Sequence, residues 1–444
     1  MFQRNTLADL RRWAQKNNRK PLILRGARQV GKTTLVDQFS EEFDVYLKLN
    51  LEKSADLNLF ENDMDIDDLV TAIYLLNNKP KSAARTLLFI DEIQNSPKAV
   101  EQLRYFYEDV PGIHVIAAGS LLESLIDRQI SFPVGRVEYM AVRPCAFSEF
   151  LGAIGETELK EAHDKVRIPE ALHEKVIGLF NTYTLIGGMP EVVRDYAANK
   201  DIVALRDIYE TLLIGYRDDV EKYSHSDGMR NILRYILSSG WTYAAQRITF
   251  EKFGNSNYRS REMGEAFRML EKAMLLELVY PTTSAVIPIN PEPRRSPKLL
   301  WLDTGLVNYS VGLQKELFGV KDISDAWRGL IAEHIVGQEL LTTDNHFSHK
   351  RAFWVRDAAG SSSEVDYVVQ VADKVIPVEV KSGTNSKLRS LHQFMEQAPH
   401  STAVRFWTNP MSVDKVTTPS GKEYSLYNLP YYYATKIEEL INVE

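Results

Sequence analysis

Cysteine is almost absent from this 444-residue chain, which holds only Cys145. A single cysteine cannot form an internal disulfide, which fits a reducing cytoplasm. Long apolar runs are also missing, since no stretch reaches about 18 uncharged apolar residues. The N-terminus, Met1 to Asn5, has no apolar signal region. We therefore expect a soluble, cytoplasmic protein with no membrane partner.

An excess of positive charge is missing as well, because 53 Lys/Arg residues stand against 60 Asp/Glu residues and the formal net charge is −7. Nucleic-acid binding would therefore depend on a local basic surface. The histidines form no metal-ligand pattern, and His346 and His349 are interpreted as part of a solvated loop. We find no repeat and no low-complexity segment. With 44% hydrophobic and 25% charged residues, the chain has an ordinary globular composition and length for about three domains.

The clearest motif is a glycine-rich loop near the N-terminus. A short apolar run, Leu22 to Leu24, leads into Gly26-x-x-x-x-Gly31-Lys32-Thr33, and a helix-compatible stretch follows. This order of strand, loop and helix is the context of a phosphate-binding P-loop. Gly26 and Gly31 have no Cβ, so the backbone N–H groups can turn toward phosphate oxygens. A chance glycine turn is the alternative, and the matching context argues against it.

The residues that follow the glycines supply charge and a metal ligand. Lys32 offers a positive charge to the β and γ phosphates, and the Thr33 hydroxyl suits Mg²⁺. The helix N-terminus at Lys32 adds a partial positive charge. We predict that ATP and Mg²⁺ are the cofactors, and that the nucleotide contacts Gly26, Ala27, Arg28, Gln29, Val30, Gly31, Lys32, Thr33 and Thr34.

Residues 1–150 alternate strand-like and helical stretches, which predicts a parallel sheet with helices on both faces. The strand-like runs are Leu22–Leu24, Val45–Leu51, Thr86–Ile90, His114–Ala118 and Val137–Ala141. The third run ends in Asp91 and Glu92. We expect Asp91 to hold Mg²⁺ through water and Glu92 to orient and deprotonate the attacking water. Acids that merely begin a loop are the alternative interpretation.

The fourth run ends in Gly119-Ser120, and here the chain resembles AAA-type ATPases. Those proteins place a polar sensor at this strand end, so the resemblance implies a nucleotide-sensing role for Ser120. Arg128, Arg136 and Arg143 follow. An arginine at the γ-phosphate stabilises transition-state charge and often comes from a neighbouring subunit. Arg136 is our candidate, which implies a homo-oligomer, and a solvated loop charge is the alternative.

Residues 151–224 are predicted to form a helical lid. Gly187-Gly188-Met189-Pro190-Glu191 marks a tight turn between apolar helices. This stretch resembles the lid of a large prokaryotic family of AAA-type ATP-binding proteins that carry a C-terminal domain of unknown function. Arg194 follows Glu191 by one helical turn, and we favour a surface salt bridge between them over a second nucleotide sensor.

Residues 225–302 are predicted to form a winged helix. Helices are expected at Asn231–Leu237, Phe250–Phe253 and Ser260–Met274, and the wing strands at Leu275–Tyr280 and Lys298–Leu302. Eleven Lys/Arg residues stand against seven Asp/Glu residues between positions 225 and 300. Arg259 and Arg261 begin the helix that would enter a DNA major groove. Double-stranded DNA is therefore a candidate partner, although winged helices also serve as protein contacts.

Residues 303–444 begin with Asp303-Thr304-Gly305-Leu306, which again resembles the same ATPase family. A helix is expected at Trp327–Leu341 and another at Leu388–Glu396. Strands are expected at Phe353–Val355, Glu364–Val371, Val375–Val380 and, as the last, Ala403–Trp407. This order resembles the core of restriction-endonuclease-like folds. Tyr431 to Tyr433 are expected in core or interface packing.

A candidate second site lies on these strands. Glu379 and Lys381 are two residues apart and point to one face of a strand, and Asp366 lies on the strand before it. Converging carboxylates suit Mg²⁺, so we predict Asp366 and Glu379 as ligands, with Glu333 as a further one. Lys381 would lower the pKa of an attacking water or steady the phosphate. A strand-edge salt bridge is the alternative, and such domains are also kept as binding modules.

The sequence thus predicts an α/β protein with an AAA-type P-loop ATPase core, a helical lid, a winged helix and a restriction-endonuclease-like domain. The first hypothesis is a Mg-dependent ATPase coupled to a C-terminal nucleic-acid-binding, possibly nuclease, module. The second is an ATP-dependent regulatory or scaffold protein that binds a protein partner and has no nuclease activity. A small-molecule kinase fits less well, because it does not need Glu92 to prepare water.

Overall fold

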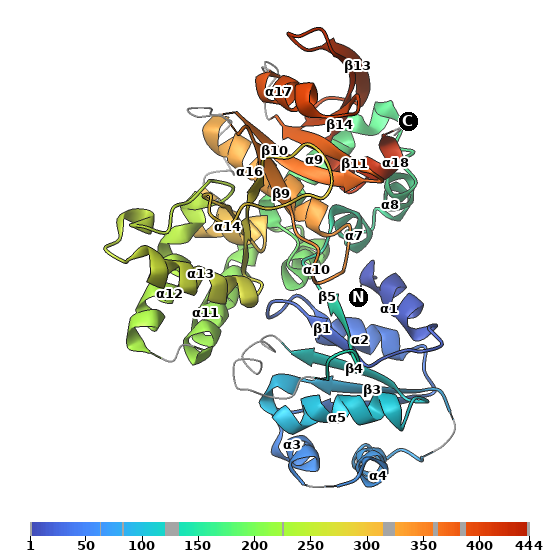
Figure 1. The fold of residues 1–444 in the computed structure, drawn as a ribbon. Helices are drawn as coiled ribbons and strands as arrows, with labels where there is room; N and C mark the ends of the chain where they lie inside the picture. The colour runs from blue at the N-terminus through green and yellow to red at the C-terminus, as the bar shows by residue number, and fades with distance from the viewer. Residues whose placement is uncertain are drawn as a thin grey trace.

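Two large β-sheets organise the chain, one built from each end of the sequence. The computed structural model describes residues 2–62, 64–81, 84–119, 133–223, 226–313, 325–357, 363–381 and 388–441. Figure 1 shows the N-terminal sheet in blue and teal and the C-terminal sheet in orange and red, with α12 and α13 to one side of both.

The N-terminal sheet has five strands in the order β2-β3-β4-β1-β5, and all of its pairings are parallel. Every predicted strand of this region is present. The strands are β1 (Leu22–Arg25), β2 (Val45–Asn50), β3 (Thr86–Asp91), β4 (His114–Gly119) and β5 (Glu138–Ala141).

Helices cover both faces of this sheet, which explains why β1, β3 and β4 are buried along their whole length. Leu22 and Leu24 pack with α1 and α2, whereas Ile23 points to the other face and packs with α4 and α5. The helices are α1 (Thr6–Ala14), α2 (Lys32–Ser40), α3 (Ser54–Glu61), α4 (Ile66–Leu76) and α5 (Pro97–Glu108).

A helical segment follows the first sheet. Gly187, with φ of 71°, ends α9, and Pro190 at the first turn of α10 begins the next helix. The turn between them is the one that the two glycines and the proline predict. The helices are α7 (Phe147–Ala153), α8 (Thr157–Asp164), α9 (His173–Ile186), α10 (Pro190–Asn199) and α11 (Arg206–Tyr223).

The next segment has two helices and a small antiparallel sheet. They are α12 (Asp227–Ser239), α13 (Ser260–Lys272), β6 (Leu276–Val279) and β8 (Lys298–Trp301). An isolated bridge joins Arg247 to Lys298 on the other side of β8 from β6. The helix expected at 250–253 is wrong, because the chain forms only a short 3₁₀ turn at Phe253–Asn255. Gly254 there has φ of 61°, outside the helical region.

The C-terminal sheet is mixed and has seven strands in the order β13-β14-β12-β11-β10-β9-β7. The β11–β12 and β12–β14 pairs are parallel, and β9, β10 and β11 are antiparallel neighbours. The strands are β7 (Pro281–Thr282), β9 (Ala352–Val355), β10 (Glu364–Val371), β11 (Lys374–Val380), β12 (Thr402–Trp407), β13 (Ser412–Thr417) and β14 (Glu423–Pro430).

Three strands of this sheet differ from the expectation. β13 and β14 follow the strand expected to be the last, and β14 is an interior strand that pairs with both β12 and β13. β7 comes from the segment expected to form the wing and pairs in parallel with β9. The loop of the expected wing is thus held against the C-terminal sheet, where the Trp354 indole donates to the Thr283 carbonyl oxygen at 3.1 Å.

The remaining helices are α14 (Thr304–Ser310), α16 (Asp325–Leu341), α17 (Arg389–Gln397) and α18 (Ile437–Leu440). α17 packs on one face of the C-terminal sheet, and α16 contacts β11 from the core shared with the N-terminal half. The three tyrosines of 431–433 are buried, as expected, and Tyr431 stacks on Phe180 of α9.

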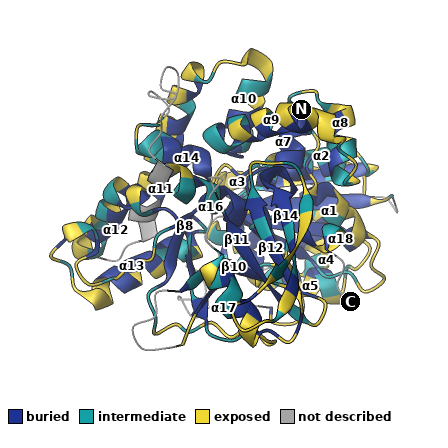
Figure 2. Cartoon of the chain, turned by 90° about the horizontal axis from the view of Figure 1, so that it is seen from above, coloured by how far each residue is buried: buried dark blue, intermediate teal, exposed yellow. Residues whose placement is uncertain are grey.

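One hydrophobic core runs from Leu7 to Ile441 and includes residues of all the predicted domains. Figure 2 shows β10, β11, β12 and β14 largely in the dark blue of buried residues. The chain therefore packs as one body rather than as separate modules on linkers. Within the described ranges, no helix is both long and apolar enough to cross a membrane.

Candidate functional site

The glycine-rich loop joins the end of β1 to the start of α2 at the carboxyl edge of the N-terminal sheet. A Cβ on Gly26 would come within 2.3 Å of the Val142 carbonyl oxygen, so only glycine fits there. Gly31 caps α2 with φ of 89°, a left-handed conformation that favours glycine. Both glycines are therefore required by the backbone path, as expected for a loop that curls around an anion.

The buried side chain of Lys32 packs against the backbone of this loop. Its Nζ donates to the carbonyl oxygens of Gly26 and Ala27, at 2.9 Å each. Burial lowers the pKa of Lys32 to about 8, although the charges of Glu92 and Asp91 act in the opposite direction. Among the described residues, no carboxylate forms an ion pair with Lys32. Its charge thus remains available to an anion seated on the loop.

Thr33 and Asp91, the two residues predicted to hold Mg²⁺, are in contact. The Thr33 hydroxyl donates to Asp91 Oδ2 at 2.8 Å across the gap between α2 and the end of β3. A hydroxyl beside a carboxylate is a ligand pair that suits a hard cation such as Mg²⁺.

Glu92 leaves the strand in a left-handed conformation, with φ of 54°, which few non-glycine residues adopt. Its side chain accepts a hydrogen bond from the Gln94 amide. Burial raises the pKa of the Glu92 carboxyl group above its usual value. A carboxylate with a raised pKa is a better proton acceptor, so Glu92 has the property of a general base.

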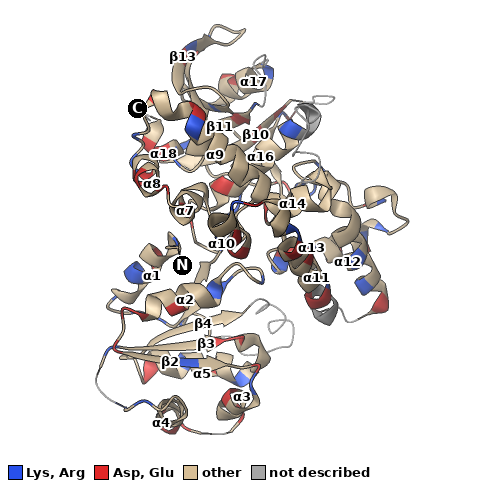
Figure 3. Ribbon diagram, turned by 180° about the vertical axis from the view of Figure 1, so that it is seen from behind, with Lys and Arg blue, Asp and Glu red and all other residues tan. Residues whose placement is uncertain are grey.

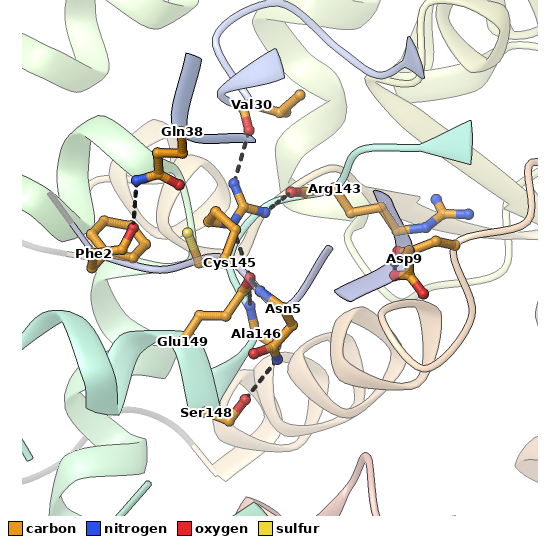
Figure 4. A network of polar contacts seen from close by, with 12 residues as sticks. Phe2, Asn5, Asp9, Val30, Gln38, Arg143, Cys145, Ala146, Ser148 and Glu149 are labelled. Carbon is orange, nitrogen blue, oxygen red and sulfur yellow. Dashed lines mark hydrogen bonds and ion pairs between the residues drawn. The ribbon is translucent and has the colours of Figure 1, made fainter. Parts of the chain in front are cut away.

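Arg4 is a site residue that the sequence reasoning missed. It is buried, its Nη1 donates to the Val30 carbonyl oxygen at 3.1 Å, and its Nη2 donates to the Arg143 carbonyl oxygen at 2.7 Å. Its Nε donates to Glu149 Oε1 at 2.9 Å. Figure 4 shows Val30, Arg143 and Glu149 around this contact. The arginine thus ties the loop to the segment that follows the N-terminal sheet and to α7.

A second arginine connects the loop to the distant helix α11. The Arg28 guanidinium forms an ion pair with the buried carboxylate of Asp219, and the Tyr216 hydroxyl donates to the Arg28 carbonyl oxygen at 3.1 Å. Asp219 and Tyr216 both lie in the second half of α11, almost two hundred residues after Arg28 in the sequence. The sequence marks Arg28 as a loop residue but gives no sign of this contact.

Three further residues were considered for contact with the nucleotide, namely Ser120, Arg136 and Arg194. Ser120 lies outside the described residues. Arg136 forms an ion pair with Glu108 at 3.0 Å. Because Glu138 pairs with Leu22 at the start of β1, Arg136 lies at the opposite edge of the sheet from its own loop. Four strand residues, about 13 Å, separate the two edges. Arg194 pairs with Glu191 at 3.5 Å on the surface of α10, which agrees with the salt-bridge interpretation.

In the C-terminal half, an internal lysine lies among the predicted acids. Lys298 Nζ is 2.6 Å from Glu333 Oε1 and 2.7 Å from Glu364 Oε1, and it is 4.0 Å from Asp366 Oδ1. Burial alone would lower the pKa of Lys298, but these carboxylates outweigh it and raise the pKa. Neither Lys298 nor Glu364 was predicted to belong to this cluster.

Glu379 lies in β11 and Lys381 directly follows this strand, and the two side chains form an ion pair, which agrees with a spacing that places them on one side. The Val380 N–H donates to Asp366 Oδ2 at 2.8 Å, which ties β10 to β11 beside them. Burial raises the pKa of Glu379 to about 8, and the nearby Asp366 charge acts in the same direction. Glu379 Oε2 is buried and accepts no hydrogen bond from the described residues. Within that part of the chain, no three His, Cys, Asp or Glu side chains form a group that could hold a metal.

The two motifs that resemble the prokaryotic ATPase family contact each other. Asp303 Oδ2 accepts a hydrogen bond from the Gly188 N–H at 2.6 Å, and a Cβ on Gly187 would clash with the same carboxylate. Pro190 lies against Gly31 on the other side, since a Cβ on Gly31 would lie 3.5 Å from its ring. A continuous set of contacts therefore connects the glycine-rich loop to the start of α14.

Comparisons with known proteins divide the chain into three parts. Residues 18–151 match an AAA domain family model. Residues 177–317 and 328–434 match two domains of unknown function, DUF8612 and DUF4143. A search of curated proteins finds no match.

Two solved structures show a distant similarity. The Walker-type ATPase PABY2304 of Pyrococcus abyssi is 14% identical with a TM-score of 0.42, over 70% of this chain and 96% of that one. PCH-2 of C. elegans is 13% identical with a TM-score of 0.26, over 42% of this chain and 57% of that one. Neither similarity is close enough to bear on activity. The family match and the geometry of the loop agree, and residues 18–151 form an AAA-type P-loop ATPase domain.

Proposed function

We propose that the chain binds ATP with Mg²⁺ and hydrolyses it. The observation that carries this proposal is the hydrogen bond between Thr33 and Asp91, 2.8 Å long, beside a lysine that no described carboxylate neutralises. Thr33 would ligate Mg²⁺ directly and Asp91 through water, and the bound ion would neutralise charge on the β and γ phosphates.

The residues around this pair have complementary tasks. Lys32 attracts the phosphates, and the loop N–H groups of residues 27–33 hold them against the N-terminus of α2. Glu92 orients a water molecule and takes its proton, which its raised pKa favours. Ser120 would sense the γ-phosphate from the end of β4. Arg136 would act only on the nucleotide of a neighbouring copy, because its own loop lies at the other edge of the sheet.

Nucleotide binding tests this proposal directly. Lys32→Ala is expected to abolish ATP binding, measured by calorimetry with Mg²⁺, because it removes the main charge for the phosphates. Lys53→Ala, an exposed lysine near the same sheet, is the matched control and should bind ATP like the unaltered protein. Unchanged binding by Lys32→Ala would contradict the assignment of the loop.

We further propose that residues 1–150, 151–224, 225–302 and 303–444 act as ATPase core, lid, winged helix and C-terminal module. Their mechanical connection would run through the contact between Gly188 and Asp303, because it joins the lid turn beside the loop to the C-terminal half. Hydrolysis would thus alter how the C-terminal module presents its surface to a partner.

Double-stranded DNA is the partner that one surface favours. Four basic residues are exposed along α13 or at its start, namely Arg259, Arg261, Arg268 and Lys272, and three acids, Glu262, Glu265 and the half-buried Glu271, share this helix. Figure 3 shows acidic and basic residues mixed over α11, α12 and α13. Binding should therefore be weak and strongly salt-dependent. A protein partner for a regulatory or scaffold ATPase is the outcome if no DNA binds at any salt concentration.

Nuclease activity is a second candidate, favoured by the buried oxygen of Glu379 that no described donor satisfies. A cation there would pair with Asp366 and Glu379, with Lys381 beside the phosphate. Glu333, the further ligand that the sequence predicts, does not complete a group of three acids around it within the described residues. Lys298 opposes this function, because its ammonium group already neutralises Glu333 and Glu364. Nicking of plasmid DNA with Mg²⁺ or Mn²⁺ that disappears in Asp366→Ala and in Lys381→Ala would establish it. No nicking in the unaltered protein would leave the cluster as a structural ion-pair network.

A further inference from the structure

The contact between Arg28 and Asp219 joins the glycine-rich loop to a helix outside the ATPase domain. Residues 18–151 form that domain, whereas Asp219 belongs to α11. The Asp219 side chain is 9% exposed and the Arg28 side chain is 43% exposed. The helix therefore contributes a fixed, buried carboxylate, and the loop contributes the more exposed partner that has room to move.

Arg28 belongs to the loop that we propose to hold the phosphates. It is in the middle of this loop, between Gly26 and Gly31, where backbone N–H groups would bind phosphate oxygens. The hydrogen bond from Arg28 to Asp219 raises its pKa most, and the charges of Asp219 and Glu92 add to the effect. Arg28 also lowers the pKa of Lys32 through its charge. One guanidinium group is thus close enough to act on both the phosphate-binding lysine and the proposed base.

A guanidinium group binds carboxylates and phosphates with the same planar set of donors. While Arg28 is paired with Asp219, those donors are engaged by the protein. A terminal phosphate that needs them must compete with the carboxylate, and this competition weakens its apparent affinity. Since ADP lacks that phosphate, only ATP binding would be affected.

We propose that Arg28 is a catalytic residue that binds the γ-phosphate of ATP, and that Asp219 is a positioning residue that withholds it. This inference depends on the ATPase function proposed above. Tyr216 supports the same arrangement, because its hydroxyl binds the Arg28 backbone and keeps the loop beside α11. Movement of α11 away from the loop releases the guanidinium group, and the helix thereby sets the preference for ATP over ADP.

The test measures binding rather than turnover. Dissociation constants for ADP and for a non-hydrolysable ATP analogue are measured with Mg²⁺ in three variants, Arg28→Ala, Asp219→Asn and the double variant. Arg28→Ala should weaken analogue binding by about tenfold or more and ADP binding by less than about threefold, as expected for one charge-assisted contact. Asp219→Asn should tighten analogue binding by about three- to tenfold and leave ADP binding unchanged.

The double variant separates positioning from a general structural role. If Asp219 acts through Arg28, the double variant binds the analogue as Arg28→Ala does, within about twofold. Asp218→Asn is the matched control, since it removes the same charge from the exposed neighbour on α11 and should change neither constant. Asp219→Glu, which keeps the carboxylate, should restore the weaker analogue binding of the unaltered protein.

Thermal unfolding without nucleotide gives an independent measurement. The ion pair exists in the nucleotide-free protein, so Arg28→Ala and Asp219→Asn should lower the midpoint by similar amounts, and the double variant by little more. Tyr216→Phe removes a single hydroxyl group and should loosen the loop without changing the charge. It keeps the inference testable if Asp219→Asn proves too unstable to purify, because it too should tighten analogue binding.

Two results would overturn the inference. One is equal analogue and ADP affinity changes in Arg28→Ala, which would mean that Arg28 does not contact the γ-phosphate. The other is analogue binding that is unchanged or weaker in Asp219→Asn, which would mean that the carboxylate does not withhold the arginine. Failure of the unaltered protein to bind either nucleotide would instead contradict the proposed function itself.

Discussion

Lys32 and Lys298 are both buried lysines near acidic side chains, yet their surroundings differ. Lys32 donates to two carbonyl oxygens of its own loop, and burial lowers its pKa to about 8. Lys298 is in contact with two carboxylates within 2.7 Å, and despite equal burial its pKa is raised. One lysine has its charge uncompensated by close carboxylates, and the other has it fully compensated.

The difference indicates which site is prepared for an external anion. An uncompensated buried cation gains most when a phosphate arrives, whereas a compensated one gains little and stabilises the fold instead. The N-terminal site therefore has the electrostatics of a binding site, and the C-terminal cluster has those of an ion-pair network. Three variants or variant pairs and one pH series test this difference between the two sites.

The largest effect is expected for Glu92→Gln. The amide cannot accept the proton of the attacking water, so ATP turnover should fall by about a hundredfold to ten-thousandfold. ATP should still bind, because Lys32, Thr33 and Asp91 remain in place. Phosphate release and calorimetry measure the two quantities. Full turnover in this variant would remove Glu92 from its proposed role.

The stability of lysine variants compares the two sites directly. Lys298→Met leaves the half-buried Glu333 and Glu364 without their cation, so the free energy of unfolding should fall by about 3 kcal/mol. Lys32→Met removes a lysine that no described carboxylate pairs with and should change it by less than about 1 kcal/mol. Urea unfolding at pH 7.5 measures both. Equal losses would mean that the contrast between the sites is wrong.

The pKa of Lys32 predicts how ATP affinity depends on pH. With a pKa of about 8 in the nucleotide-free protein, Lys32 is charged below pH 8 and increasingly neutral above it. Affinity should therefore be constant from pH 6.5 to 7.5 and fall above pH 8, by up to about tenfold per pH unit. Lys32→Arg keeps its charge over this range. The variant should bind without this decline, even if it binds more weakly throughout.

Arg194→Ala should have the smallest effect. The ion pair with Glu191 is exposed on both sides, so the free energy of unfolding should change by less than about 0.5 kcal/mol. ATP turnover should stay within twofold of that of the unaltered protein. A loss of turnover without a loss of stability would favour a nucleotide-sensing role for Arg194. The nucleotide site would then include a residue of α10.

Local sequence was enough to place the candidate residues of the N-terminal site along the fold, because they lie at strand ends or in the loop after β1. Gly26, Lys32, Thr33 and Asp91 all lie at the carboxyl edge of one parallel sheet, where strand ends meet. Arg4 was missed because its partner Glu149 is 145 residues away. A lone arginine just before the first helix carries no local signal of such a contact.

The C-terminal prediction was less complete, because here too the missed residue contacts partners that are distant in the sequence. The spacing of Glu379 and Lys381 predicted one strand face correctly. Lys298 was assigned to a wing, and nothing near it in the sequence shows that α16 and β10 will enclose it. β13 was missed because none of its residues is buried and its two valines, Val413 and Val416, are three residues apart, which does not give the alternation that marks a strand.

The short strand β7 has a consequence for how the chain assembles during synthesis. Pro281 and Thr282 form the edge of a sheet whose other strands begin at Ala352. During translation β7 is therefore synthesised well before β9, its only neighbour in the described part of that sheet. A fragment that ends at residue 302 contains β7 without its sheet. A fragment that starts at residue 303 leaves the edge of β9 unpaired, and an unpaired edge strand promotes aggregation. Neither half is a natural unit of expression, and the C-terminal sheet is complete only when the chain before it has already been made.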